Sequence, residues 1–314
     1  MKRFKNIVYF ADGNVESRPA LERAAELALR NRARLTVLGA LRHFPRDIQM
    51  LLPVTPPADL QDLALQDLRE RLEKLVKPVR TKRLRLGIEV RCGMPFIEII
   101  RDVIEHKRDL LMLTAEGSGW LRDHLLGSMT MRLMRKCPCP IWALKPGPHR
   151  SFRNILAAVD LDPMDERKVA LADKIMELAT SLARLEGSTL RIVHAWDVYR
   201  ETALRGWADT IARDIENSHR RWLDDLLARH DLTRLAINAQ LLKGEPAHVI
   251  DRLAAKRGID LIVMGTVGRT GIPGFLIGNT AETVLGRVRC SVLAVKPEGF
   301  VSPVKLDEAE TITT

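Results

Sequence analysis

The chain has 314 residues, of which 46% are hydrophobic and 29% are charged, and its formal net charge is +10. This length suffices for two domains of ordinary size, and the composition is typical of a folded globular protein, not a disordered one. No apolar run approaches the roughly 18 residues that cross a bilayer, so no membrane partner is expected. The basic charge favours anionic partners without choosing between nucleic acid, lipid and metabolites.

The N-terminal stretch MKRFKNIVYFADG predicts a β-strand rather than a signal peptide, because Asp12 interrupts its apolar run early. The Cys137-Pro-Cys139 pair lacks a second pair at a zinc-like spacing, so no metal site is predicted. The cysteines show no disulfide-framework spacing, which indicates a reducing compartment and a cytoplasmic protein. They are Cys92, Cys137, Cys139 and Cys290.

The chain contains an internal repeat, and this repeat decides the predicted architecture. Residues 109–117 (DLLMLTAEG) recur as 260–268 (DLIVMGTVG), displaced by 151, and 139–146 (CPIWALKP) recur as 290–297 (CSVLAVKP) at the same displacement. The repeat predicts a first domain over 1–147, a second over 151–298 and a C-terminal tail over 299–314.

Each copy alternates apolar, β-rich runs with amphipathic stretches of helical period. In the second copy Asp162 is predicted to cap a helix that has Pro163 at its first position and ends near Gly187. Strands alternating with helices predict two tandem α/β domains, each a Rossmann-like, doubly wound, five-stranded parallel sheet. The other elements expected in the second copy are strands 154–159, 190–196, 236–242, 261–265 and 291–295 and helices 207–229 and 246–256, with a further helix after Gly278.

The densest basic run, RTKRLR at 80–85, lies between a predicted helix and a predicted strand, and we interpret it as a solvated connection. The chain has seven Phe and two Tyr, so it offers few aromatic platforms for stacking bases. Nucleic acid is therefore not an expected partner.

A glycine-rich segment, GTVGRTGIPGFLIGNTAE at 265–282, follows the strand predicted to end at Gly265. A doubly wound sheet binds ligands at the carboxyl ends of its strands, and a helix N-terminus offers unpaired N–H groups to an anion. Glycine allows close approach of the backbone to phosphate oxygens. The competing interpretation is a surface loop that glycine merely keeps flexible. The definite spacing Gly265-x2-Gly268-x9-Gly278, followed by Asn279-Thr280, favours a phosphate loop.

This spacing, in a five-stranded α/β unit, resembles the nucleotide loop of the universal stress protein family, and the duplication resembles the tandem branch of that family. The resemblance implies an open parallel sheet, pairing of units through the last strand and, as in one branch, binding of ATP, together with Mg²⁺. It also implies an intramolecular pseudo-dimer in which residues 140–145 and 292–296 pair, and leaves a further homodimer open.

The resemblance implies the following roles. Asp160 would meet the adenine or ribose, and Ala195, after the second strand, would contact the base through its backbone. Residues of the glycine segment would line the ribose and phosphate path. The family has Ser or Thr where Asn279 stands, and an amide can still donate. The segment's implied ligand residues are Met264, Gly265, Gly268, Gly278, Asn279 and Thr280.

The first copy departs further from the family pattern. Thr114 replaces Gly265 and disfavours a positive φ and close contact, and Glu116 adds a negative charge beside the expected phosphates. The sequence therefore predicts that the nucleotide occupies the second copy. What remains of a site in the first copy is Asp12, Gly117, Gly127 and Ser128.

The motifs indicate a binding protein and not a dedicated enzyme. The chain has no G-x-x-x-x-G-K-[ST] motif and no deaminase-type metal motif, and His194 is interpreted as a satisfied core histidine instead of an acid or base. We expect a stress-response regulator that binds ATP, with at most slow hydrolysis. Two alternatives stay open: a scaffold with no ligand or an apolar, lipid-like one, and, third, a nucleic-acid binder whose affinity falls steeply with salt.

Overall fold

The computed structural model describes seven segments, and two of the expected site residues, Gly117 and Gly268, lie outside them. In the described part of the chain, no helix is both long and apolar enough to span a membrane. The described segments are residues 4–13, 17–44, 57–115, 127–146, 151–197, 208–266 and 277–306.

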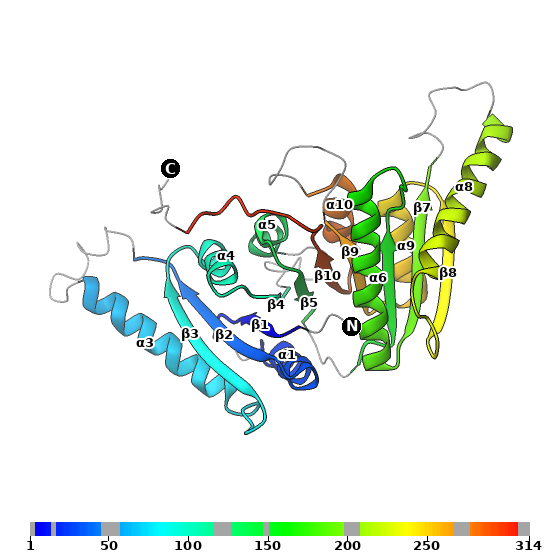
Figure 1. The fold of residues 1–314 in the computed structure, drawn as a ribbon. Coiled ribbons are helices and arrows are strands. Elements are labelled where there is room, and N and C mark those ends of the chain that lie inside the picture. Colours follow the sequence, from blue (N-terminus) through cyan, green and yellow to red (C-terminus); the bar gives the residue numbers. More distant parts are fainter. Residues whose placement is uncertain are drawn as a thin grey trace. The chain divides into compact units, whose positions relative to one another are not determined.

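The described chain divides into two compact units, and the first contains a parallel five-stranded sheet in the order β3-β2-β1-β4-β5 (Figure 1). Helices α1 and α3 cover one face of this sheet, and α4 and α5 cover the other. The elements are β1 (Asn6–Phe10), α1 (Arg18–Asn31), β2 (Arg34–Leu41), α3 (Pro57–Val76), β3 (Arg85–Cys92), α4 (Pro95–Glu105), β4 (Leu110–Thr114), α5 (Ser128–Lys136) and β5 (Ile141–Leu144).

The second unit repeats this architecture, with the strand order β10-β9-β6-β7-β8 and all pairs parallel. Helices α6 and α8 cover one face, and α9 and α10 cover the other (Figure 1). This arrangement confirms the predicted fold class. The elements are β6 (Asn154–Val159), α6 (Glu166–Glu186), β7 (Thr189–Trp196), α8 (Ala208–Ala228), β8 (Ala236–Lys243), α9 (Pro246–Arg257), β9 (Leu261–Gly265), α10 (Asn279–Arg287) and β10 (Ser291–Val295).

The central strands carry the cores because they are apolar along their whole length. Every residue of β10 is buried, as are Ile155–Val159 of β6 and Leu261–Met264 of β9. A strand that is covered on both faces has no solvent-facing side, so it shows no alternation of polar and apolar residues. This explains why the sequence reveals these strands as continuous runs.

One predicted helix start is wrong. Helix α6 begins at Glu166, not at Pro163, and its N-cap is Asp165, whose carboxylate accepts hydrogen bonds from the backbone N–H groups of Arg167 and Lys168. Residues 162–165 form a turn in which the N–H of Asp165 donates to the carbonyl of Asp162 at 3.0 Å. Pro163 fits the second position of such a turn as well as it fits the first position of a helix, and the turn is what forms here.

The two units differ at equivalent helix ends. Helix α6 ends at Gly187 with φ 67°, and α9 ends at Gly258 with φ 56°. The equivalent left-handed positions of the first unit hold Arg32 with φ 51° and Lys107 with φ 50°. Only glycine adopts this conformation without steric cost. The backbone of the first unit is therefore strained at two basic residues, whereas the second unit has glycine at the equivalent positions.

A buried ion network distinguishes the first unit. The Arg108 guanidinium donates to both carboxylate oxygens of Asp102, at 2.9 and 3.1 Å, and the Asp102 side chain is fully buried. Arg108 also donates to Thr36 Oγ1 at 2.7 Å and to Glu89 Oε1 at 3.1 Å. At the equivalent positions the second unit has buried Leu253 and Ile259, so an apolar pair can fill the same space.

This equivalence predicts a strongly non-additive pair of substitutions. Arg108→Ile alone leaves Asp102 as a buried charge without its main partner and should lower the free energy of unfolding by about 3–5 kcal/mol. The double variant Asp102→Leu/Arg108→Ile installs the apolar pair of the second unit and should recover most of that loss. Urea unfolding followed by hydrogen exchange of the β1 and β2 amides measures both. Losses that simply add would contradict this account of the network.

Candidate functional site

The carboxyl ends of β6 and β9 flank the point at which the strand order of the second sheet reverses. Ala158 pairs with Met264, so Asp160 and Thr266, two residues further on, follow adjacent strand ends. Val159 pairs with His194, which places Asp160 beside Ala195 of β7. In open α/β sheets this crevice is where ligands bind, and the structure brings the expected residues Asp160, Ala195 and Gly265 to it.

Helix α10 begins at the same crevice. Its N-cap is Gly278, with φ −65° and ψ 143°, and no side chain caps it. The Gly278 N–H donates to the carbonyl of Thr266 at 2.8 Å, which ties the helix start to the end of β9. Asn279 and Thr280 form the first turn, where Asn279 is exposed and Thr280 half-buried. The first N–H groups of a helix have no partner within it, so this end can receive an anion.

Thr266 is a residue of this crevice that sequence reasoning missed. It is fully buried, and its Oγ1 has no hydrogen-bond partner among the described residues. A buried hydroxyl without a partner is unfavourable, and such groups call for a ligand, a water or a nearby chain segment. The first copy has Ala115 at the equivalent position, and this difference between the repeats is the signal that could have found Thr266.

Gly265 has a different reason to be glycine from the one expected. It is not among the described glycines with positive φ, because it is the last residue of β9 and pairs with Val295. A Cβ built on Gly265 would lie 2.7 Å from Leu171 Cδ2 of α6, so this glycine makes room for α6. The expectation that position 265 needs a positive φ is therefore wrong. Met264 is buried in the same strand.

Asp160 is exposed and forms an ion pair. Lys168 Nζ lies 3.3 Å from the carboxylates of both Asp160 and Asp162. Ala195 lies within β7, paired with Leu242, and not after the strand as expected. The two residues thus flank the crevice with one exposed, ion-paired carboxylate and one stretch of strand backbone.

The imidazole of His194 lies beneath this edge and is fully satisfied. Its Nδ1 lies 3.1 Å from the carbonyl of Val159, and its Nε2 lies 2.7 Å from Nδ1 of His219, which stacks on Trp196. Burial lowers the pKa of His194 from 6.5 to about 4. A neutral, buried and doubly bonded imidazole matches the predicted core histidine.

Polar side chains near the equivalent strand ends of the first unit contact one another. Tyr9 donates to the carbonyl of Ser17 at 2.8 Å, and its hydroxyl lies 3.2 Å from Thr114 Oγ1. Ser17 in turn donates to Asp12 Oδ1 at 3.3 Å. Gly127 and Ser128 stand at the start of α5, as the repeat predicts. The polar groups at this strand end thus bind one another.

Two other polar clusters lie away from the crevice. Carboxylate or imidazole atoms of Glu89, Asp102 and His106 lie within 4.8 Å of one another, as a metal site would require. The Arg108 guanidinium already binds both carboxylates there, so it takes the place of a cation.

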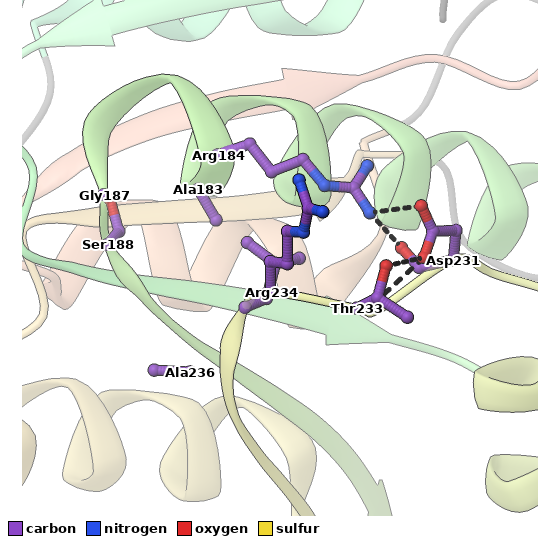
Figure 2. Close-up of a pocket in the computed structure, with 9 residues that line it drawn as sticks. Ala183, Arg184, Gly187, Ser188, Asp231, Thr233, Arg234 and Ala236 are labelled. Atoms are coloured by element: carbon purple, nitrogen blue, oxygen red, sulfur yellow. Dashed lines mark hydrogen bonds and ion pairs between the residues drawn. The ribbon is translucent and has the colours of Figure 1, made fainter.

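At the opposite, amino edge of the second sheet lies a pocket of about 740 Å³, whose lining includes Arg184, Asp231 and Arg234 (Figure 2). Arg184 donates to the carboxylate of Asp231 at 2.9 Å, and the hydroxyl of Thr233 donates to the same carboxylate at 2.6 Å. The Thr233 and Arg184 hydrogen bonds lower the pKa of Asp231. The charge of this pocket is therefore partly neutralised within the chain.

The chain belongs to the universal stress protein family, because the model of the "Universal stress protein family" matches residues 3–145 and again residues 151–296. It is a tandem, UspE-type member: Universal stress protein E of Escherichia coli K12 is 28% identical over 321 residues, which cover 99% of each chain. A functionally unknown protein of Pseudomonas aeruginosa PAO1 superposes with a TM-score of 0.69 at 25% identity over 94% of this chain and 93% of that one. A universal stress protein of Archaeoglobus fulgidus, at 18% identity and a TM-score of 0.60, covers 93% of this chain and 98% of that one and shares the fold.

The buried imidazole makes stability depend on pH. The pKa of His194 is 6.5 in the unfolded chain and about 4 in the folded one, so the unfolded state binds more protons between these values and stability falls as the pH falls through this window. For this group the loss between pH 7.5 and pH 5 is about 2 kcal/mol. We expect the free energy of unfolding of His194→Gln, measured in urea, to fall about 2 kcal/mol less over that range. Parallel pH profiles of both proteins would contradict this.

Proposed function

We propose that the second unit binds an adenine nucleotide, ATP, in the crevice between β6 and β9, and that this stress-response protein acts as a nucleotide-dependent regulator and not as a dedicated enzyme. The observation that carries the proposal is the unpartnered, fully buried hydroxyl of Thr266 beside the uncapped start of α10 at Gly278. A hydroxyl without a partner beside the unpaired N–H groups of a helix start offers the kind of donors that a phosphate group requires.

The rest of the nucleotide fits the neighbouring strand ends. Asp160 can accept a hydrogen bond from a ribose hydroxyl. If its carboxylate turns from Lys168 toward the ribose, Lys168 keeps its ion pair with Asp162, at 3.3 Å. The backbone of Ala195 lies beside Asp160 for the base. When Mg²⁺ accompanies ATP, its ligands are chiefly phosphate oxygens and water, so the site does not need a cage of carboxylates.

The first unit is a poorer site for the same ligand. Ala115 stands in place of Thr266, and the hydroxyl of Thr114 already lies 3.2 Å from that of Tyr9. We therefore assign the nucleotide to the second unit alone. The imidazole of His194 is buried and its pKa is about 4, which favours a structural role over acid–base catalysis.

Gly278→Asp should abolish ATP binding and leave the fold intact. The backbone at Gly278 is extended, so aspartate is accommodated there, and as an N-cap it would stabilise α10. Its carboxylate would occupy the N–H groups and repel phosphate. Isothermal titration of the full chain should give one ATP per chain for the wild type and none for the variant, with a melting temperature that is unchanged or higher.

The matched control is Gly127→Asp, which makes the same change at the equivalent helix start of the first unit. It should retain one ATP per chain. Two equivalent sites in the wild type would contradict the assignment to the second unit alone. Loss of binding through Gly127→Asp but not through Gly278→Asp would show that the nucleotide binds the first unit. A wild-type chain that binds no ATP would contradict the proposal and favour the alternative of a scaffold that binds no nucleotide.

Thr266→Val should separate binding from folding. Valine keeps the shape of threonine and removes only the hydroxyl, which has no partner among the described residues, so the free energy of unfolding without ligand should not fall. Loss of one hydrogen bond to a phosphate should weaken ATP binding by about tenfold. Unchanged affinity in this variant would remove Thr266 from the site.

A further inference from the structure

The amino edge of the first sheet carries a cluster of exposed basic side chains that the proposed nucleotide site does not use. Arg32 caps the end of α1, Arg34 begins β2 and Arg85 begins β3, and the turn between α3 and β3 supplies the others (Figure 1). We call this cluster the basic edge. It consists of Arg32, Arg34, Arg80, Lys82, Arg83 and Arg85.

The sheet register brings these charges together. Arg34 and Arg85 are direct partners across β2 and β3, and the Arg34 N–H donates to the carbonyl of Lys5 on the next strand at 2.9 Å. Neighbouring parallel strands lie about 4.8 Å apart, so the starts of β2 and β3 set two of these cations side by side, and the exposed Lys5, just before β1, extends the row to roughly 10 Å. Like charges placed side by side repel each other, and an anionic partner would offset this repulsion.

The basic edge has no internal counter-charge in the described part of the chain. No ion pair or side-chain hydrogen bond of these six residues is found among the described residues. The neighbouring carboxylate of Asp109 accepts hydrogen bonds from the backbone N–H groups of Lys5 and Asn6, so it is already engaged. Burial does not explain the cluster either, because all six residues are exposed.

The second unit shows what this edge looks like without the charges. At the positions equivalent to the basic edge it has one cation, Arg234, and one anion, Asp231, and the rest are neutral. Asp231 there binds Arg184 (Figure 2). The same fold therefore forms with only one of the six cations. The equivalent residues are Gly187, Thr189, Asp231, Thr233, Arg234 and Ala236.

The backbone conformation of Arg32 is a second, independent indication that its positive charge has a function. Its φ of 51° lies in the left-handed region, where the second unit uses Gly187. A glycine at position 32 would relieve this strain, so the arginine is retained at a cost to stability. Lys107, with φ 50°, repeats the pattern two strands away on the same edge.

We propose that the basic edge binds the phosphate backbone of double-stranded nucleic acid without regard to sequence. A row of cations over roughly 10 Å matches the closely spaced phosphates of a duplex. Residues 28–34 and 77–85 contain no aromatic side chain on which unpaired bases could stack. The only large apolar side chain exposed in these two stretches is Leu29, too little for insertion into a lipid surface.

The test uses the full chain and a fluorescein-labelled 25-base-pair duplex of mixed sequence, followed by anisotropy from 50 to 200 mM KCl. The variant Arg32→Gly/Arg34→Thr/Lys82→Thr/Arg85→Ala installs the residues of the second unit. Each lost phosphate contact lowers the slope of log affinity against log salt by about 0.9, so the variant's slope should be shallower by about 3–4. Its affinity at 100 mM KCl should fall by roughly tenfold or more.

A charge-matched control distinguishes the basic edge from net charge. Arg234→Gln/Arg252→Gln/Lys256→Gln/Arg257→Gln removes the same number of exposed cations from the second unit and should retain both affinity and slope. Equal loss in both variants, or no binding by the wild type at 50 mM KCl, would overturn the proposal. So would binding to phosphatidylserine vesicles in place of the duplex. Gly278→Asp should bind the duplex normally, so failure of the nucleotide site leaves this test intact.

Discussion

The positions of both proposed binding surfaces follow from one constraint: each sheet is parallel and covered by helices on both faces. A strand covered on both sides has no solvated face, so polar chemistry is confined to the two edges at which strands end. Because all strands point the same way, one edge collects the carboxyl ends and the helix starts, and the other collects the amino ends and the helix ends. The crevice at Asp160 and Thr266 lies at the first edge, and the cluster around Arg34 and Arg85 lies at the second.

The repeat makes the two units internal standards for each other. Where both hold the same type of residue, the scaffold explains it, as with Asp109 and Asp260, whose carboxylates accept hydrogen bonds from the backbone at the start of β1 and β6. Where they differ at equivalent positions, the scaffold tolerates both residues and function or local packing decides. The buried pair Asp102–Arg108 against Leu253–Ile259 belongs to packing, whereas Thr266 against Ala115 belongs to the site.

The sequence was sufficient for the fold because its signals are local or periodic. The apolar run of β9, the proline that opens α9 and the glycine that ends α6 each act within a few residues. The same locality misplaced the start of α6, since Asp162-Pro163 satisfies both a turn and a helix cap and only the hydrogen bonds decide. Local reasoning also explained Gly265 by backbone conformation, whereas the structure explains it by the close approach of Leu171 from helix α6.

Residues whose role depends on register were not accessible from the sequence. Arg34 and Arg85 are 51 positions apart and become neighbours only through the pairing of β2 with β3, so RTKRLR alone looks like an ordinary solvated turn. For Thr266 the sequence offers only its difference from Ala115, and its burial and the position of α10 are needed to make it a candidate site residue. A single sequence shows which residues are present, but the environment that makes one of them a site comes from packing.

Duplication within one chain has a consequence for symmetry. In a homodimer of single domains both subunits have the same sequence. A charge gained at one edge therefore appears on both subunits, whether it is useful there or not. The two copies here are separately encoded, and one can hold Arg32 in a strained conformation while the other has Gly187. Duplication within one chain thus allows the two copies to differ in sequence. A single chain can then assign different tasks to its two halves, which a symmetric pair of identical subunits cannot do.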